Sequence, residues 1–338
     1  MRAYEITAGS QGFDGLHRCD RPDPKAAAGQ ILVRMQAASL NYRDLLIARG
    51  QYFGGPLQQN TVPLSDGAGE VIAIGAGVTR FRVGDRVAGT FFRDWNDGLP
   101  LPGPRVALGA PPVDGVLAEY VVFGEQNAVA IPAHLSFEAA ATLPCAAVTA
   151  WHALMVVGQV QPGHSVLVLG TGGVSIFALQ LARLAGARVL VTSSSDDKLA
   201  RARELGAAAG VNYRATPAWD QEVVRLNDGR GIDLVVEVGG GATLGRAIQA
   251  IGIGGKIALI GVLSGHTGDA NPLALMTKWA SLHGIFVGSR SMFEKLNTAI
   301  AANRLEPVID RVFAFEEATQ AYRHLERGAH IGKVVIRI

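Results

Sequence analysis

The residues with the clearest chemical meaning form a glycine-rich turn, Gly170-Thr171-Gly172-Gly173-Val174, which follows the apolar run 165–169. At such a turn Gly170 allows a tight reversal, Gly172 lets the backbone approach a pyrophosphate, and Gly173 opens a helix whose first amides face the anion. Glycines alone also fit an ordinary tight turn, but here a strand precedes them, a helix follows, and a second strand comes about 20 residues later. The pattern predicts a dinucleotide-binding site.

The end of that second strand indicates which dinucleotide binds. NAD sites usually place an acidic residue there to hold the ribose hydroxyls, whereas this strand ends in hydroxyl side chains without a carboxylate. Hydroxyls and cations suit a 2′-phosphate better, and the candidates are Ser193, Ser194, Ser195, Lys198, Arg201 and Tyr213. We therefore expect NADPH rather than NADH. Two other interpretations stay open: Ser195 caps the following helix, and Asp196 turns toward the ribose.

Strands and helices alternate through the part of the chain that carries this turn. The strands are continuous apolar runs, which is typical of a parallel sheet covered by helices on both faces. We expect helices at 173–185, 196–205, 219–226 and 242–250, and strands at 165–169, 188–192, 232–238, 256–260 and 284–287. The sequence thus predicts an α/β protein with a doubly wound sheet.

Residues 1–127 have a different texture, because short apolar strands alternate with Gly and Pro. This spacing is typical of antiparallel pairing or a barrel. We expect strands at 31–35, 69–75, 83–89 and 117–122, a surface loop at 93–114, and a helix at 134–151. The C-terminal part adds predicted helices at 292–302 and 315–327 and a strand at 332–338.

Length and composition limit the class of protein. The 338 residues predict about two domains, and a hydrophobic fraction of 49% allows a large core. A net charge of +2 gives no basic field for nucleic acid or anionic membranes. Cys19 and Cys145 are too few for a disulfide framework, and no apolar signal region or membrane span is evident. We expect a soluble cytoplasmic protein whose partner is a small molecule.

Several motifs together resemble the medium-chain dehydrogenase/reductase superfamily, the group of zinc alcohol dehydrogenases and zinc-free quinone oxidoreductases. Besides the glycine turn, these motifs are Ser39-Leu40-Asn41-Tyr42-Arg43-Asp44, Pro63-Leu64-Ser65-Asp66-Gly67-Ala68-Gly69-Glu70, Phe81-Arg82-Val83-Gly84-Asp85-Arg86-Val87 and Pro144-Cys145-Ala146-Ala147-Val148-Thr149-Ala150. The resemblance implies a GroES-like β-barrel catalytic domain over 1–127, a Rossmann domain over 128–289, a segment 290–338 returning to the catalytic domain, and a cleft between the domains. It further implies that Thr149, Val238 and Gly261 contact the cofactor.

The positions that bind catalytic zinc in this superfamily are altered. Zinc-containing members place Cys at the position of Asn41, His at that of Ser65, and Cys or a carboxylate near Cys145; here only Cys145 is retained. Amide and hydroxyl groups are poor zinc ligands, and the four-cysteine structural zinc lobe is also missing. The resemblance therefore implies a zinc-free enzyme. The alternative is an alcohol or aldehyde dehydrogenase with a weak metal site at Asp66 and Cys145.

Without zinc, simple alcohol oxidation loses its Lewis acid. Quinones and α,β-unsaturated carbonyls accept hydride more readily, because one or two hydrogen bonds can stabilise the resulting enolate or hydroquinone anion. We expect an NADPH-dependent reductase of such electrophiles, with candidate catalytic residues Asn41, Tyr42, Tyr52 and Ser65. Each tyrosine is equally well explained as a core or rim residue, and Asn41 as a side chain that stabilises a turn.

Two further expectations concern assembly and the absence of catalysis. The resemblance implies a homodimer formed through the edge of the Rossmann sheet near residues 282–287, where an apolar edge strand would otherwise be exposed. A non-catalytic NADPH-binding protein is the remaining alternative to an enzyme.

Overall fold

The computed structural model describes residues 1–100, 102–103 and 106–338. The chain divides into two compact units, Met1–Val148 with Gly288–Ile338, and Thr149–Val287. Residues 128–148 belong to the first of these units, in which helix α2 (Phe137–Ala140) packs on strands β3 (Gln30–Ser39) and β4 (Asp66–Ile74). The expected loop 93–114 falls partly outside the described residues, at 101, 104 and 105.

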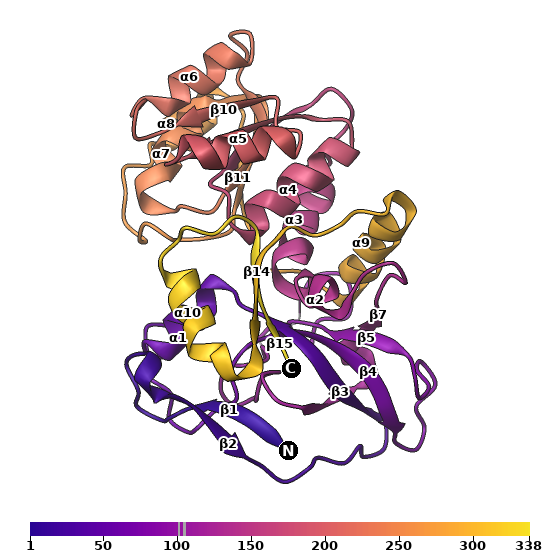
Figure 1. The fold of residues 1–338 in the computed structure, drawn as a ribbon. Coiled ribbons are helices and arrows are strands. Elements are labelled where there is room, and N and C mark those ends of the chain that lie inside the picture. The colour runs from indigo at the N-terminus through magenta and orange to yellow at the C-terminus, as the bar shows by residue number, and fades with distance from the viewer. Residues whose placement is uncertain (101, 104–105) are drawn as a thin grey trace. The chain divides into compact units, whose positions relative to one another are not determined.

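The first unit is built on a mostly antiparallel sheet (Figure 1). Within the described residues its strand order is β14-β15-β3-β4-β5-β7, and β6 also pairs with β3. The strands not yet delimited are β5 (Arg86–Gly89), β6 (Tyr120–Gly124), β7 (Ala128–Ala130), β14 (Ile309–Ala314) and β15 (Lys333–Arg337). A separate antiparallel pair joins β1 (Arg2–Ile6) to β2 (Leu16–Asp20). The sequence did not predict β1, β2, β7 or β14.

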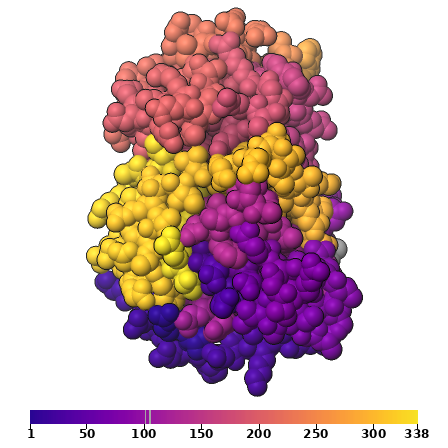
Figure 2. All heavy atoms as spheres, turned by 45° about the vertical axis from the view of Figure 1, so that its right-hand side comes forward, coloured from indigo at the N-terminus to yellow at the C-terminus, as the bar shows by residue number. Residues whose placement is uncertain are grey.

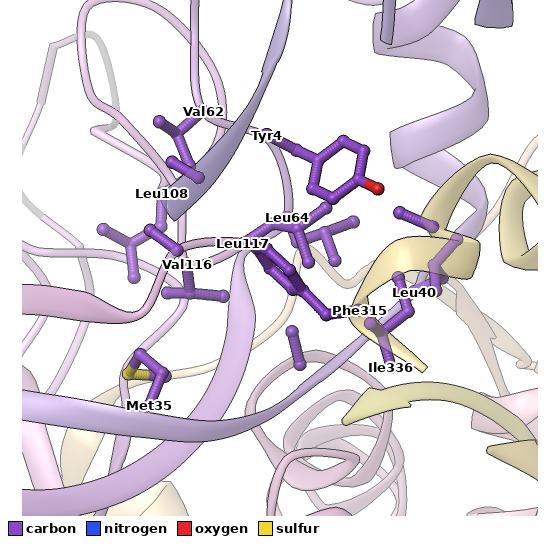
Figure 3. Packing of buried hydrophobic residues seen from close by; sticks show 14 of the residues in the cluster. Tyr4, Met35, Leu40, Val62, Leu64, Leu108, Val116, Leu117, Phe315 and Ile336 are labelled. Atoms are coloured by element: carbon purple, nitrogen blue, oxygen red, sulfur yellow. The ribbon is translucent and has the colours of Figure 1, made fainter. Parts of the chain in front are cut away.

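The C-terminal segment is an integral part of this unit. β15 pairs antiparallel with β3, Val335 opposite Ser39. Phe315 and Ile336 pack in one buried cluster with Met35, Leu64 and Leu117 of the N-terminal part (Figure 3). In the space-filling view the yellow C-terminal segment lies directly against the indigo and violet N-terminal residues (Figure 2). Residues close to the C-terminus therefore take part in the core of the N-terminal domain.

The expected helix 134–151 is interrupted. The chain forms α2, then a π-helical turn at Leu143–Ala147, then α3 (Val148–Trp151). Pro144 has no N–H to give to a regular helix, and the N–H of Cys145 donates to Asp66 Oδ2 at 3.0 Å. The other helices of the first unit are α1 (Tyr42–Ala48), α9 (Arg290–Asn303) and α10 (Ala318–Glu326). The sequence predicted α9 and α10 and missed α1.

The second unit, every residue of which is described, contains a parallel sheet in the order β10-β9-β8-β11-β12-β13. This confirms the doubly wound sheet. Its strands are β8 (Ser165–Leu169), β9 (Arg188–Ser193), β10 (Ala209–Asn212), β11 (Ile232–Glu237), β12 (Ile251–Leu259) and β13 (Ser281–Gly284). The expected strand 284–287 is wrong: the edge strand ends at Gly284, and Val287 has a positive φ of 58° that a strand cannot hold.

Helices connect these strands: α4 (Gly173–Leu184), α5 (Asp196–Glu204), α6 (Trp219–Leu226), α7 (Gly241–Ala250) and α8 (Pro272–Thr277). From β8 the chain builds outward through β9 to β10, then returns to β11 on the other side of β8. The order reverses between β8 and β11, and ligands of such sheets bind at the carboxyl ends of the strands at this point. No helix among the described residues is long and apolar enough to cross a membrane.

Candidate functional site

The glycine turn lies at this reversal point, between β8 and α4. Gly170 has a φ of +74°, and Gly172 is the residue that caps α4. Ser175 Oγ donates to Leu169 O at 2.7 Å, which fixes the turn against the strand. A Cβ added to Gly170 or Gly172 would meet no atom within 4 Å. The open space beside these two backbone positions, in front of the α4 amides, fits the pyrophosphate of a dinucleotide.

The ends of β9 and β10 lie side by side, Ser193 opposite Asn212, and bring the predicted phosphate-binding residues to one edge. Tyr213 N donates to Ser193 O at 3.0 Å, so the segment that carries Tyr213 continues beside the end of β9. The side chain of Asp196 accepts from Asn212 Nδ2 at 3.0 Å. This bond occupies one oxygen of the acid that could otherwise face a ribose.

Three further observations concern the residues that follow β9 and β10. Ser195 Oγ accepts from Lys198 N at 3.5 Å, so Ser195 does cap α5, as one interpretation held. Arg201 pairs with Glu204, with 2.6 Å between Nη1 and Oε2. Arg214, directly after Tyr213, is exposed and adds a cation that sequence reasoning passed over. Its position right after the third strand was the available signal.

The loop after β11 holds a buried acid that the sequence analysis missed. Glu237 is fully buried, and its Oε1 accepts from Gly239 N at 2.7 Å, Gly240 N at 3.1 Å and Thr243 Oγ1 at 2.7 Å. Burial raises the pKa of this carboxyl. The sequence feature that could have revealed it is an acidic residue at the end of a largely apolar strand. Glu237 therefore shapes the loop in which Val238 lies.

The remaining predicted cofactor residues lie in α3, in the glycine turn and in the loops that follow β11 and β12. A Cβ on Gly261 would lie 2.5 Å from Val238 O, so these two loops touch and position 261 requires glycine. Thr171 is buried in the glycine turn, and Thr149 is buried in α3. Contact of Thr149, Val238 and Gly261 with the cofactor stays a prediction.

In the first unit, Asp66 links positions that are far apart in the sequence. It is fully buried; its Oδ1 accepts from Ser65 Oγ at 2.6 Å and its Oδ2 from Cys145 N at 3.0 Å. Burial raises the pKa of Asp66, while the charge of Lys333 and the side chains of Ser65 and Asn41 lower it. The predicted residues Asn41 and Ser65 thus belong to one buried polar cluster with Asp66, Cys145 and Lys333.

Lys333 is the member of this cluster that sequence reasoning missed. It begins β15 and is only 3% exposed. Its Nζ donates to Leu40 O at 2.6 Å and to Asn41 Oδ1 at 2.5 Å. A buried lysine is rare unless it is paired, but a single lysine at the start of an apolar strand gives no hint of burial.

The two candidate tyrosines have different surroundings. The side chain of Arg43 is buried; its guanidinium lies 5.1 Å from the ring centre of Tyr52 and 4.8 Å from that of Phe91. Burial raises the pKa of the Tyr52 phenol, and Arg43 lowers it. Tyr42 is 43% exposed at the first position of α1 and makes no hydrogen bond with the described residues of the cluster. Tyr52 therefore lies against a buried guanidinium, whereas Tyr42 lies at the surface.

The donor groups of the cluster do not fit a zinc ion. The oxygen of Asn41 faces an ammonium, Ser65 Oγ donates a hydrogen bond to Asp66, and both oxygens of Asp66 accept hydrogen bonds. Burial raises the pKa of the Cys145 thiol far above its usual range, which disfavours the thiolate that binds zinc. Among the described residues, no three His, Cys, Asp or Glu side chains are grouped so that they could hold a metal ion.

Comparison with known proteins agrees with this organisation. Residues 27–133 match the alcohol dehydrogenase GroES-like domain, and residues 173–302 match the zinc-binding dehydrogenase model. A zinc-type alcohol dehydrogenase-like protein of Schizosaccharomyces pombe is 45% identical over 343 residues, which cover 99% of each chain.

Two solved structures share the fold over the whole of this chain. One, described as an NAD-dependent alcohol dehydrogenase, is 36% identical, covers 100% of both chains and has a TM-score of 0.91. The other, the mycobacterial protein Rv1454c complexed with NADPH, is 26% identical, also covers 100% of both chains and has a TM-score of 0.83. The chain therefore belongs to the medium-chain dehydrogenase/reductase superfamily and is an oxidoreductase with a GroES-like and a Rossmann domain.

Proposed function

We propose that this protein is an NADPH-dependent oxidoreductase that reduces quinones or α,β-unsaturated carbonyl compounds without zinc. The observation that carries the proposal is the buried cluster of Asn41, Ser65, Asp66, Cys145 and Lys333. In it an amide and a hydroxyl stand at two positions where zinc-containing members of the superfamily are expected to carry ligands, and the amide oxygen accepts from the Lys333 ammonium. NADPH, when bound, supplies the hydride. The first unit then has to bind the acceptor and stabilise the negative charge that develops on its oxygen.

Two groups of the first unit support this role. The Asn41 amide carries N–H groups that can donate to a developing oxyanion, and removing one such donor from an enzyme typically costs about 10²–10³ in kcat. The Tyr52 phenol, whose pKa is raised by burial, keeps its proton at neutral pH and can pass it to the reduced substrate. Ser65 already donates its only hydroxyl proton to Asp66, so it serves the site by orienting Asp66.

The choice of NADPH is supported by the edge formed by β9 and β10. The segments that carry Ser194, Lys198, Tyr213 and Arg214 follow these two strand ends and contain hydroxyls and cations, and Asp196 is bonded to Asn212. Rv1454c, which binds NADPH, supports the same choice, whereas the other structural relative is described as NAD-dependent. Steady-state kinetics with both cofactors decides between them.

The test of the function is NADPH oxidation with a panel of quinones, enals and enones, by protein that has been treated with a chelator and measured for zinc content. We expect turnover of at least one conjugated acceptor with no dependence on added zinc. Alcohol oxidation that appears only when zinc is added would favour the alternative metal-dependent dehydrogenase. Tight NADPH binding without turnover of any acceptor would indicate a non-catalytic protein.

We also propose that two copies associate through β13. This strand is the edge of the parallel sheet, so one side of its backbone has no strand partner within the described unit. Apolar side chains near it are exposed, among them Ile253 (77%), Trp279 (79%) and Leu282 (40%). Light scattering should give the mass of a dimer for the wild type, and Leu282→Lys should shift it to the monomer. A wild-type monomer at micromolar concentration would contradict the proposal.

A further inference from the structure

The contact between Lys333 and Asn41 fixes which end of the Asn41 amide faces the ammonium. Lys333 Nζ lies 2.5 Å from Asn41 Oδ1, and an ammonium has donors only. The amide oxygen must therefore point toward Lys333, and the amino group must point away from it. Lys333 also donates to Leu40 O at 2.6 Å, so its own position is held by the backbone.

The amino group that is turned away has no hydrogen-bond partner. Asn41 Nδ2 is buried, and no described residue accepts from it. It lies near enough to Asp66 to help lower the pKa of that carboxyl, without reaching hydrogen-bonding geometry. Both oxygens of Asp66 already accept from Ser65 Oγ and Cys145 N. A buried unpaired donor is unfavourable, so this one points to an acceptor that arrives with a ligand.

The positive charge of Lys333 can strengthen the N–H donor of the Asn41 amide. Its ammonium lowers the pKa of three neighbouring groups, the carboxyls of Asp44 and Asp66 and the thiol of Cys145. A cation bound to the oxygen of an amide withdraws electron density and strengthens the N–H groups at its other end, especially in a low-dielectric interior. The single ammonium can therefore hold the amide in place and polarise it at the same time.

We propose that Lys333 is the positioning residue of the acceptor site: it orients the Asn41 amide so that Nδ2 donates to the carbonyl oxygen of the substrate. This inference rests on the proposed function and narrows its substrate class. The site offers an N–H donor, and both oxygens of the neighbouring Asp66 carboxyl already accept a hydrogen bond. It should select a ligand oxygen that is a pure acceptor, such as a conjugated carbonyl or a phenolate, over an alcohol.

The first test measures the preference for an oxyanion directly, without turnover. The probe is 4-nitrophenol, bound to the protein in the presence of NADP⁺, and its phenolate absorbance is followed as a function of pH. In the wild type we expect the pKa of the bound phenol to fall below that of the free phenol. Lys333→Met and Asn41→Asp should both abolish this shift. Lys333→Arg should retain part of it, because a guanidinium can still donate to the Asn41 oxygen.

The second test uses turnover. Lys333→Met should lower kcat for the best conjugated acceptor about 100-fold, as loss of an oxyanion donor does, and leave KM for NADPH nearly unchanged. The double variant Lys333→Met/Asn41→Asp should be no slower than Asn41→Asp alone, because both changes remove the same donor. Lys25→Met, which removes an exposed lysine of the same unit, is the matched control.

The two tests distinguish a failure of the Lys333 inference from a failure of the proposed reductase function. A phenolate shift that needs Lys333, without reduction of any acceptor, supports the inference and contradicts the proposed reductase. Reductase activity with a phenolate shift that is the same in wild type, Lys333→Met and Asn41→Asp overturns the inference. If Lys333→Met does not fold, as judged by its melting curve, Lys333→Arg and Asn41→Asp decide: an unchanged shift in both overturns it.

Discussion

The carboxyl group of Asp44, which is bonded to the backbone of Asn41, allows a quantitative test of burial beside the cluster. Its side chain is 1% exposed; it accepts from Asn41 N at 2.7 Å and lies 3.7 Å from Arg43 Nη1. Burial raises the pKa of Asp44 from 3.8 to about 6, although Arg43 opposes the shift. Asp44→Asn keeps an oxygen for the Asn41 N–H and removes the titrating proton, so it isolates the effect of this group.

The pKa in the folded state lies above that in the unfolded state, so between these values the folded protein holds the proton and the unfolded chain does not. The contribution of Asp44 to stability is therefore largest below the unfolded pKa of 3.8 and is lost as the pH rises to about 6. A shift of about two units at about 1.4 kcal/mol each amounts to about 3 kcal/mol. The Asp44→Asn variant does not lose this unfolding free energy as the pH rises, because its amide does not titrate.

The assay is urea unfolding of both proteins at several pH values between about 4 and 7, where the carboxyl titrates. Relative to Asp44→Asn, the wild type should lose about 3 kcal/mol of unfolding free energy across this range. The difference between the two proteins cancels the titration of all other groups. A difference that stays constant with pH, or one that changes in the opposite direction, would refute the view that Asp44 is a buried carboxyl destabilised by desolvation.

Three further predictions concern the cofactor and the proton donor. Lys198→Glu should raise KM for NADPH about tenfold or more and KM for NADH much less, because only NADPH carries the 2′-phosphate; equal changes would contradict the NADPH assignment. Gly172→Ala should weaken NADPH binding, measured by fluorescence titration, with a melting temperature like that of the control Gly12→Ala, because neither added Cβ meets an atom within 4 Å; unaltered affinity would place the pyrophosphate elsewhere. Tyr52→Phe should lower kcat about 10²-fold, the usual scale for a proton donor, and more than Tyr42→Phe, whose ring is 43% exposed; a larger effect of Tyr42→Phe would reverse the assignment.

Local patterns in the sequence predicted most of the second unit. Its apolar strands and helices carry their periodicity within ten or so residues, and the glycine turn carries its own backbone requirement, such as the φ of +74° at Gly170. The doubly wound arrangement and the glycine turn were therefore predicted, whereas β10 and α8 were missed and β12 begins five residues earlier than expected. The edge strand was misplaced by three residues, from 284 to 281, because a short apolar run does not mark where pairing stops.

The sequence by itself also determined that the zinc-binding pattern is altered at Asn41 and Ser65, because this depends only on residue type. Only the tertiary structure decided what these residues do. It brought Lys333 from the last strand to Asn41, placed the Ser65 hydroxyl where it donates a hydrogen bond to Asp66, and left Tyr42 exposed while Tyr52 packs against Arg43. The physical reason is that a buried polar group bonds to whichever partner the fold brings to it. Such a partner can be far away in the sequence, as Lys333 is 292 residues from Asn41.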